Sequence, residues 1–153
     1  AIEIAQEAEA KSLEQQYAWG VAKSHDHLGL FYMIIGENEK SVAFATKGLE
    51  QFQRLHDEKG KASCLYTLGS VSYKKGNHHQ GLEFLYECLR IQQDQQDLAG
   101  QSKTLKAIGY IYEIFQEFDK ALETYQKCRE ISHLNGVRRP TLSNEGFVCP
   151  IFN

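Results

Sequence analysis

An aliphatic-glycine pair recurs every forty residues in this chain, as Leu28-Gly29, Leu68-Gly69 and Ile108-Gly109. Cutting the chain from Val21 gives three equal blocks, 21–60, 61–100 and 101–140, with the pair at the same place in each. A period of this length is typical of a repeat array, in which each unit buries its apolar face against its neighbours. Because such an array presents an extended surface, the pattern favours a binding function over catalysis.

The composition is that of a globular protein with a helical core. The chain has 153 residues, of which 42% are hydrophobic and 24% charged, and its net charge of −3 gives no basic face for nucleic acid. It contains neither a long apolar run for a membrane span nor a recognisable signal peptide. The four cysteines form no CxxC pair, which fits reduced thiols better than extracellular disulfides. We therefore expect a cytoplasmic protein with no nucleic-acid or membrane partner.

Each block predicts two antiparallel helices. The first helices are expected over 21–35, 61–75 and 101–115, and the second helices over 38–56, 78–96 and 118–134. Gly36 and Gly76 stand in the turn between them, where glycine readily takes the positive φ of a helix C-cap, and Gln116 replaces them in the third block. Helix-stopping residues then recur at the block ends, which predicts breaks at these positions: Gly20, Gly60, Gly100 and Pro140.

The two ends of the chain depart from the repeat. Residues 1–20 align with the second half of a block, so we expect a lone second helix that ends at Gly20, in a piece of a longer protein. Residues 141–153 lack the aliphatic-glycine pair but carry Phe147, Val148 and Ile151. This tail either docks over the last repeat, enters a neighbour's groove or is a truncation end. The predicted fold is an all-α right-handed solenoid of three repeats plus a leading half-repeat.

Three packing columns run along the second helices at spacings of three residues, which places them on one helix face. The first column is aliphatic, the second mixed and the third small. Their members are Ile2, Val42, Leu82 and Leu122; Ala5, Ala45, Leu85 and Tyr125; and Ala8, Gly48, Cys88 and Cys128. The small column, like the three glycines of the recurring pair, predicts a close approach between helices.

The blocks resemble the tetratricopeptide repeat, a helix-turn-helix unit with the motif L-G-x2-Y. Leu28-Gly29 with Tyr32 and Ile108-Gly109 with Tyr112 match this motif, whereas Ser72 takes the tyrosine place in the second block. No block has the family's tryptophan. The period exceeds the usual ~34 residues. This longer variety is similar to repeats of bacterial signalling proteins, which lie beside cyclase, kinase or transcription-regulator modules, and to repeats of eukaryotic adaptors of the kinesin light chain type.

The resemblance implies that the first helices line a groove for a protein or peptide segment. Mapping the groove-facing positions onto this chain selects these residues: Lys23, Asp26, Leu30, Met33 and Ile34; Ser63, Tyr66, Ser70, Tyr73 and Lys74; and Lys103, Lys106, Tyr110, Glu113 and Ile114. Aromatic anchors beside lysines would suit an acidic peptide or a terminal carboxylate. Alternatively, these are ordinary exposed helix residues. A clamp for chaperone tails is not expected, since Asp26 would repel the carboxylate.

No constellation of catalytic or metal-binding residues is visible. His25 and His27 point to different sides of a helix, and the cysteines are explained by their packing column. We therefore expect neither catalytic residues nor a metal or cofactor. The leading hypothesis is an interaction or sensory domain of a larger bacterial signalling protein. The alternatives are a self-assembling structural module, with a homodimer formed through the repeat ends or the tail, and a non-catalytic regulatory part of an enzyme such as a nucleotide cyclase or kinase.

Overall fold

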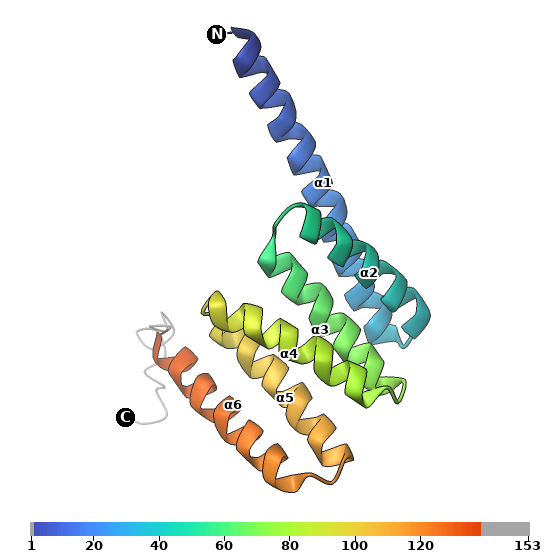
Figure 1. The fold of residues 1–153 in the computed structure, drawn as a ribbon, viewed down its shortest axis with the longest axis vertical. Helices are drawn as coiled ribbons and strands as arrows, with labels where there is room; N and C mark the ends of the chain where they lie inside the picture. Colours follow the sequence, from blue (N-terminus) through green and yellow to red (C-terminus); the bar gives the residue numbers. More distant parts are fainter. Residues whose placement is uncertain (1, 139–153) are drawn as a thin grey trace, which may run out of the picture.

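A computed structural model describes residues 2–138, which form six consecutive α-helices (Figure 1). They are α1 (Ile2–Ile35), α2 (Asn38–Arg54), α3 (Glu58–Lys74), α4 (His78–Asp94), α5 (Leu98–Ile114) and α6 (Phe118–Arg138). The helices pair as α1–α2, α3–α4 and α5–α6, and each pair packs against the next. The predicted all-α solenoid of helix-turn-helix units is confirmed. The tail 141–153, with the proposals made for it, lies outside the described residues.

The turns within each pair form at the predicted positions. Gly36 and Gly76 take left-handed φ values of 84° and 89°, and Gln116 takes the same kind of conformation at 60°. Glycine adopts this conformation at little cost because it has no Cβ. The two glycines therefore end α1 and α3 as the sequence indicates.

The turns between pairs lie earlier than predicted. The breaks expected at Gly60 and Gly100 fall instead at 55–57 and 95–97, so both glycines belong to the first turn of the following helix. Asp57 and Asp97 are the N-caps, and each accepts a hydrogen bond of 2.9 Å from the backbone N–H of the glycine three residues later. This bond satisfies one of the free N–H groups at a helix start. The recurring glycine thus marks a capped helix start, three residues past the break.

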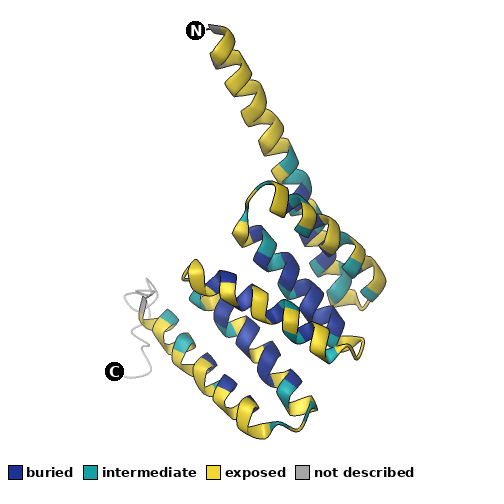
Figure 2. Cartoon of the chain, viewed as in Figure 1, coloured by how far each residue is buried: buried dark blue, intermediate teal, exposed yellow. Residues whose placement is uncertain are grey.

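The expected break at Gly20 is wrong. Helix α1 runs without interruption from Ile2 to Ile35, so residues 1–20 do not form a separate second helix. The residue at the place of Asp57 and Asp97 is Tyr17, whose side chain cannot accept a capping bond in their manner. The first half of α1 consequently projects from the body, and it is exposed along most of its length (Figure 2).

The core lies between successive helix pairs, one residue away from the predicted aliphatic column. Val42 and Leu82 are only half-buried, and Leu122 is exposed. The side chains buried in their place are the small residues that precede them: Ser41, Gly81 and Ala121. One residue along a helix is a rotation of about 100°, so a small residue here lets the paired helices approach closely. Ser41 Oγ donates a 2.7 Å hydrogen bond to the carbonyl oxygen of Gly29 across this contact.

The predicted close approach at the recurring glycines is confirmed. A methyl group on Gly69 would lie 2.8 Å from Leu85 Cγ, and one on Gly109 would lie 2.6 Å from Tyr125 Cε1. The small column is buried at Gly48, Cys88 and Cys128, although Ala8 is exposed because the projecting part of α1 has no neighbour there. The apolar clusters formed by these contacts hold the first helices α1, α3 and α5 in a row.

Candidate peptide-binding surface

A hollow of about 220 Å³ lies on the first-helix face of the array, where α1, α3 and α5 meet. Five predicted groove residues share it: Lys23 and Leu30 of α1, Ser63 and Tyr66 of α3 and Lys103 of α5. The hollow also has walls that the sequence interpretation missed: Lys59, Ala62, Gln92, Gln95, Asp97 and Gly100. Most of these lie at helix ends, outside the first-helix positions to which the groove pattern was confined.

A stacked cation organises this hollow. The Lys103 ammonium lies 4.3 Å from the centre of the Tyr66 ring. Such a contact holds a positive charge over an aromatic face without neutralising it. Burial raises the pKa of Tyr66, so its hydroxyl stays protonated and can donate a hydrogen bond. The pair therefore presents a positive charge, an apolar ring and a hydroxyl donor within one small site.

A second aromatic pair continues the surface. The Tyr73 and Tyr110 rings meet edge to face with their centres 5.8 Å apart. Tyr73 is half-buried, and burial, followed by its neighbours Tyr66 and Tyr110, raises its pKa. Tyr110 remains exposed, which leaves one ring of this pair free to contact a ligand. We call Lys23, Leu30, Tyr66, Tyr73, Lys103 and Tyr110 together the groove face.

The remaining predicted groove residues lie at the margins of this surface. Met33 is half-buried, while Lys106 and Glu113 are exposed on α5. Glu113 lies near Tyr125 of α6, where burial and then this carboxylate raise the pKa of Tyr125 to about 12. Ile34, Lys74 and Ile114 are also exposed, near the ends of their helices. None of these six residues lines the hollow.

Two predicted groove residues are buried, which corrects the sequence interpretation. Asp26 is only 2% exposed, and Ser70 is likewise buried. Asp26 Oδ1 accepts a 2.8 Å hydrogen bond from Ser63 Oγ, and Lys23 Nζ lies 3.7 Å from Asp26 Oδ2. The carboxylate thus joins α1 to α3 inside the array. It is not available to a ligand.

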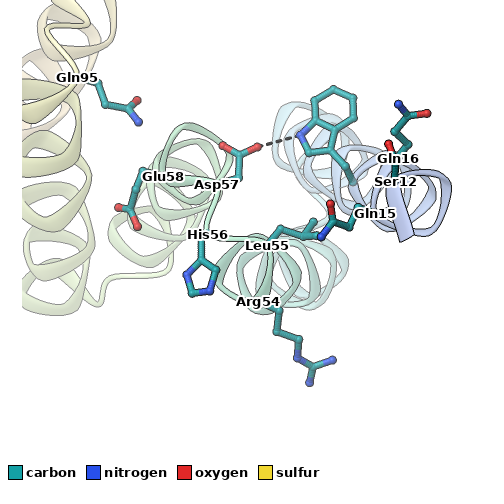
Figure 3. Close-up of a pocket in the computed structure, with 10 residues that line it drawn as sticks. Ser12, Gln15, Gln16, Arg54, Leu55, His56, Asp57, Glu58 and Gln95 are labelled. Carbon is teal, nitrogen blue, oxygen red and sulfur yellow. Dashed lines mark hydrogen bonds between the residues drawn. The ribbon is translucent and has the colours of Figure 1, made fainter. Parts of the chain in front are cut away.

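A larger hollow, of about 670 Å³, lies where the projecting part of α1 leaves the body (Figure 3). Its wall includes Trp19, whose indole Nε1 donates a 2.9 Å hydrogen bond to Asp57 Oδ2. Since Asp57 Oδ1 also caps α3, both carboxylate oxygens are engaged. Arg54 and His56 point away from the indole (Figure 3), so the polar groups here do not converge on one point. This hollow is therefore a weaker ligand site than the groove face, despite its size.

The described residues contain no group of three or more His, Cys, Asp or Glu side chains that could hold a metal ion. Within the same residues no helix has the length and apolar character to cross a membrane. The buried thiols Cys64 and Cys88 are poor nucleophiles, because burial above all raises the pKa of each, to about 11 for Cys88. The candidate site consists of aromatic rings and ammonium groups.

Comparison with known proteins agrees with this geometry. The family model of the tetratricopeptide repeat matches residues 61–132, which comprise α4 and α5 and most of α3 and α6. Residues 61–132 therefore carry tetratricopeptide repeats. Repeats of this family generally mediate protein–protein interaction and are generally non-catalytic scaffolds. The protein-binding character predicted from the sequence is therefore confirmed at this general level.

Two curated relatives of this chain are photosystem I assembly proteins Ycf3 from strains of Prochlorococcus marinus. The protein of the subspecies pastoris strain is 26% identical over 92 residues, which cover 60% of this chain and 51% of the relative. The protein of strain SARG is 27% identical over the same coverage. The chain spans about half the length of the curated relatives it matches.

Two solved structures share the tetratricopeptide-repeat fold. The repeat domain of Arabidopsis FLU superimposes with a TM-score of 0.70 at 20% identity, over 78% of this chain and 98% of that domain. BtubC from P. vanneervenii superimposes with a TM-score of 0.69 at 25% identity, over 88% of this chain and 56% of that protein. The first likeness concerns the fold alone.

Proposed function

We propose that the groove face binds an extended protein segment in which an acidic side chain lies next to an apolar one. The observation that carries this proposal is the Lys103–Tyr66 pair, which offers a positive charge and an aromatic ring within 4.3 Å. Lys23 and Lys59 line the same hollow and add to its positive charge, which exceeds that of the single carboxylate, Asp97. An acidic side chain entering here meets favourable electrostatics, and a neighbouring apolar side chain can pack on the rings.

The size of the hollow supports a side-chain anchor rather than a small-molecule site. Its volume of about 220 Å³ is below the ~300–1,000 Å³ usual for small-molecule pockets. The groove face continues from it toward the Tyr73–Tyr110 pair, along the row of first helices. A ligand that uses both features must be extended, as a peptide segment is.

The test is an array of short peptides of matched length and varied charge, probed with the parent chain and with Tyr66→Ala/Lys103→Glu. We expect the parent to retain acidic-apolar peptides, and the variant to lose them at least roughly tenfold in affinity, as expected for a hot spot. Tyr86→Ala/Lys127→Glu makes the same chemical changes on a different hollow, between α4 and α6, and serves as the matched control. Equal retention by parent and groove variant, with unchanged melting curves, would refute the proposal.

For the biological setting, we propose that this chain is the interaction domain of a larger cytoplasmic signalling protein. The long repeat period supports this reading. The groove face then regulates an attached module, such as a nucleotide cyclase or kinase. If so, Tyr66→Ala/Lys103→Glu in the full-length protein changes the response of that module to the partner and leaves its basal activity unchanged.

Self-association is the second candidate function. It is favoured by one specific observation: large apolar side chains are exposed along α1, among them Leu13, Tyr17 and Phe31.

A further inference from the structure

The outer side of α1 carries a continuous exposed stripe. Its members recur at separations of three, four or seven residues, which keeps them on one side of a helix. They include Leu13, Tyr17, Ser24, Leu28, Phe31 and Ile35, all of which are exposed. The side chains that α1 buries against the body, such as Ala22 and Asp26, lie on the opposite side of the helix. The body therefore leaves these six side chains exposed.

Three positions of this stripe, those of Ser24, Leu28 and Phe31, are core positions in the later repeats. Phe31 is 54% exposed, whereas the residues forty and eighty positions later, Val71 and Ile111, are fully buried. Ile108 and Ile111 of α5 are buried in one cluster with Leu85 and Leu89 of the preceding helix, α4. Helix α1 has the side chains for such a contact, but no helix of the described chain covers them.

Neither end of the described array can supply the missing cover in the manner of α4. Leu49 of α2 and Leu89 of α4 make the apolar contact with the helix that follows each of them. The residues at the same place of the repeat are charged at both ends of the array: Glu9 in the projecting part of α1 and Arg129 in α6. Burying an unpaired charge against apolar side chains is costly. Folding back of residues 2–13 is therefore disfavoured, and so is head-to-tail stacking of α6 onto a second copy.

The stripe is instead complementary to itself. Two α1 helices can run antiparallel and cross at the level of Ala22, whose own side chain faces the body. Gly20 of one copy then faces Ser24 of the other, and Leu13 faces Phe31. In the same register Tyr17 faces His27, and Ala10 faces Ile34. The members of each pair lie equally far from Ala22, at two, nine, five and twelve residues respectively. A two-fold symmetric interface requires this reciprocity, in which each residue meets its opposite number twice.

The sizes of the facing side chains also fit. Two small residues, Gly20 and Ser24, meet at the crossing point and allow the helix backbones to approach. Large side chains meet on either side, and the small Ala10 faces the large Ile34. Ala10, Tyr17, Ser24 and Phe31 are spaced by seven residues, as are Leu13, Gly20, His27 and Ile34. These two sets take the a and d positions of a heptad repeat, which is the pattern of paired helices.

We propose that this chain forms a symmetric homodimer in which two α1 helices pair antiparallel through the outer stripe, crossing at Ala22. The occupant of the exposed apolar face is a second copy of the same face. The seam from Ala10 to Ile35 is roughly 39 Å long at 1.5 Å per residue. The groove-face residues of α1, Lys23 and Leu30, lie beside this seam, since His27 and Ile34 follow them by four residues. The dimer is independent of the peptide-binding proposal.

The first test measures molar mass by sedimentation equilibrium over about a thousandfold range of protein concentration. We expect the parent to approach twice the 17.5 kDa of one chain. Leu13→Glu and Phe31→Glu should each weaken the dimer roughly tenfold or more, since each substitution acts twice in a symmetric interface. Leu122→Glu places the same charge on an exposed leucine of α6 and should leave the dimer unchanged. A parent that stays monomeric throughout, or a dimer that both stripe variants retain, overturns the proposal.

The second test fixes the direction of pairing by disulfide cross-linking. Leu13→Cys/Phe31→Cys, with Cys149→Ser in every variant, should form a covalent dimer under mild oxidation. The two positions lie about 27 Å apart along one helix, far beyond the ~7 Å Cα separation that a disulfide spans, so the bond must join two copies. Leu13→Cys alone should not cross-link. Efficient cross-linking of this single variant means that the helices run parallel, which overturns the proposed register.

Discussion

Asp26 shows how a single polar residue joins two repeats. Its carboxylate accepts a hydrogen bond from Ser63 of the next repeat and lies beside the Lys23 ammonium, while almost none of its surface reaches water. A buried acceptor that loses its partner, or a donor left without its acceptor, costs the free energy of desolvation. Asp26 is therefore a structural lock between α1 and α3, next to the groove face.

Replacing this carboxylate should reduce the stability of the array. We expect Asp26→Ala to lower the free energy of unfolding by about 2 kcal/mol, because it leaves the Ser63 hydroxyl without its charged acceptor. Lys23→Ala should cost below ~1 kcal/mol, since that ammonium is partly solvated and the ion pair is long. Urea denaturation of both variants measures the difference. Equal losses would mean that the ion pair, not the hydrogen bond, is the stabilising contact.

Two glycines at the same place in the repeat should respond oppositely to a methyl group. A methyl on Gly60 would overlap the Phe52 ring, whereas nothing lies within 4 Å of one on Gly20. We expect Gly60→Ala to destabilise the fold by ~1–3 kcal/mol through overpacking. Gly20→Ala should stabilise the monomer by ~0.5–1 kcal/mol, because alanine is the better helix former. Thermal unfolding at low protein concentration checks the signs, and a loss of stability in Gly20→Ala contradicts the open surroundings of this residue.

At the scale of the helix, α1 differs from α3 and α5 in how it begins. Helices α3 and α5 start at an aspartate cap that follows a residue with φ of 54°, His56 or Gln96. The equivalent residues in α1 are Gln16 and Tyr17, and the helix continues through them. One missing cap therefore turns a helix-turn-helix connection into a helix of 34 residues.

Restoring the start signal should break α1. We expect Gln16→Gly/Tyr17→Asp to uncouple residues 2–14 from the rest of the helix, because glycine favours the turn conformation and aspartate caps the new helix start. Amide hydrogen exchange should become faster for residues 2–16 and stay unchanged from Val21 onward. Tyr17→Ala keeps the helix and controls for loss of the ring. Unchanged protection in the double variant would mean that the cap does not decide where α1 begins.

Sequence reasoning succeeded where a local signal decides the structure. The turns at Gly36 and Gly76 depend on one residue type, and the shared hollow of Tyr66 and Lys103 depends on helical phase. It failed where a neighbour decides. Asp26 is buried because of the way α1 is turned about its own axis where it packs against α3. Likewise, a shift of one residue along α4 separates the core residue Gly81 from the half-buried Leu82. Lys59 and Gln92 reach the hollow from helix ends, which no first-helix pattern includes.

For the molecule as a whole, burial has the same effect on several ionisable groups. It raises the pKa of Cys64, Cys88, Tyr66, Tyr73, Tyr86 and Tyr125, and each of these is neutral in its protonated form. The folded state therefore keeps protons that the unfolded chain releases at high pH. Stability is fully present below the unfolded pKa values and falls as the pH rises above them.

Alkaline pH should thus destabilise the array. The loss begins near pH 9, the ordinary pKa of a thiol, and the contribution of Cys88 continues to fall until about pH 11. Each buried thiol adds up to about 1.4 kcal/mol per pH unit to the slope. Urea denaturation between pH 7 and pH 10 measures this, and Cys88→Ala should give a shallower slope. A free energy of unfolding that stays constant across this range would contradict the burial of the thiols.

The hydrogen bond between Trp19 and Asp57 has a spectroscopic consequence. Trp19 is the only tryptophan of the chain, and it lies where the projecting part of α1 meets the start of α3. Excitation selective for indole therefore reports on this junction and not on α5 or α6. In a quasi-one-dimensional array, opposite ends can unfold separately. A mismatch between the fluorescence and circular dichroism transitions would thus reveal, without any added label, which end of the array opens first.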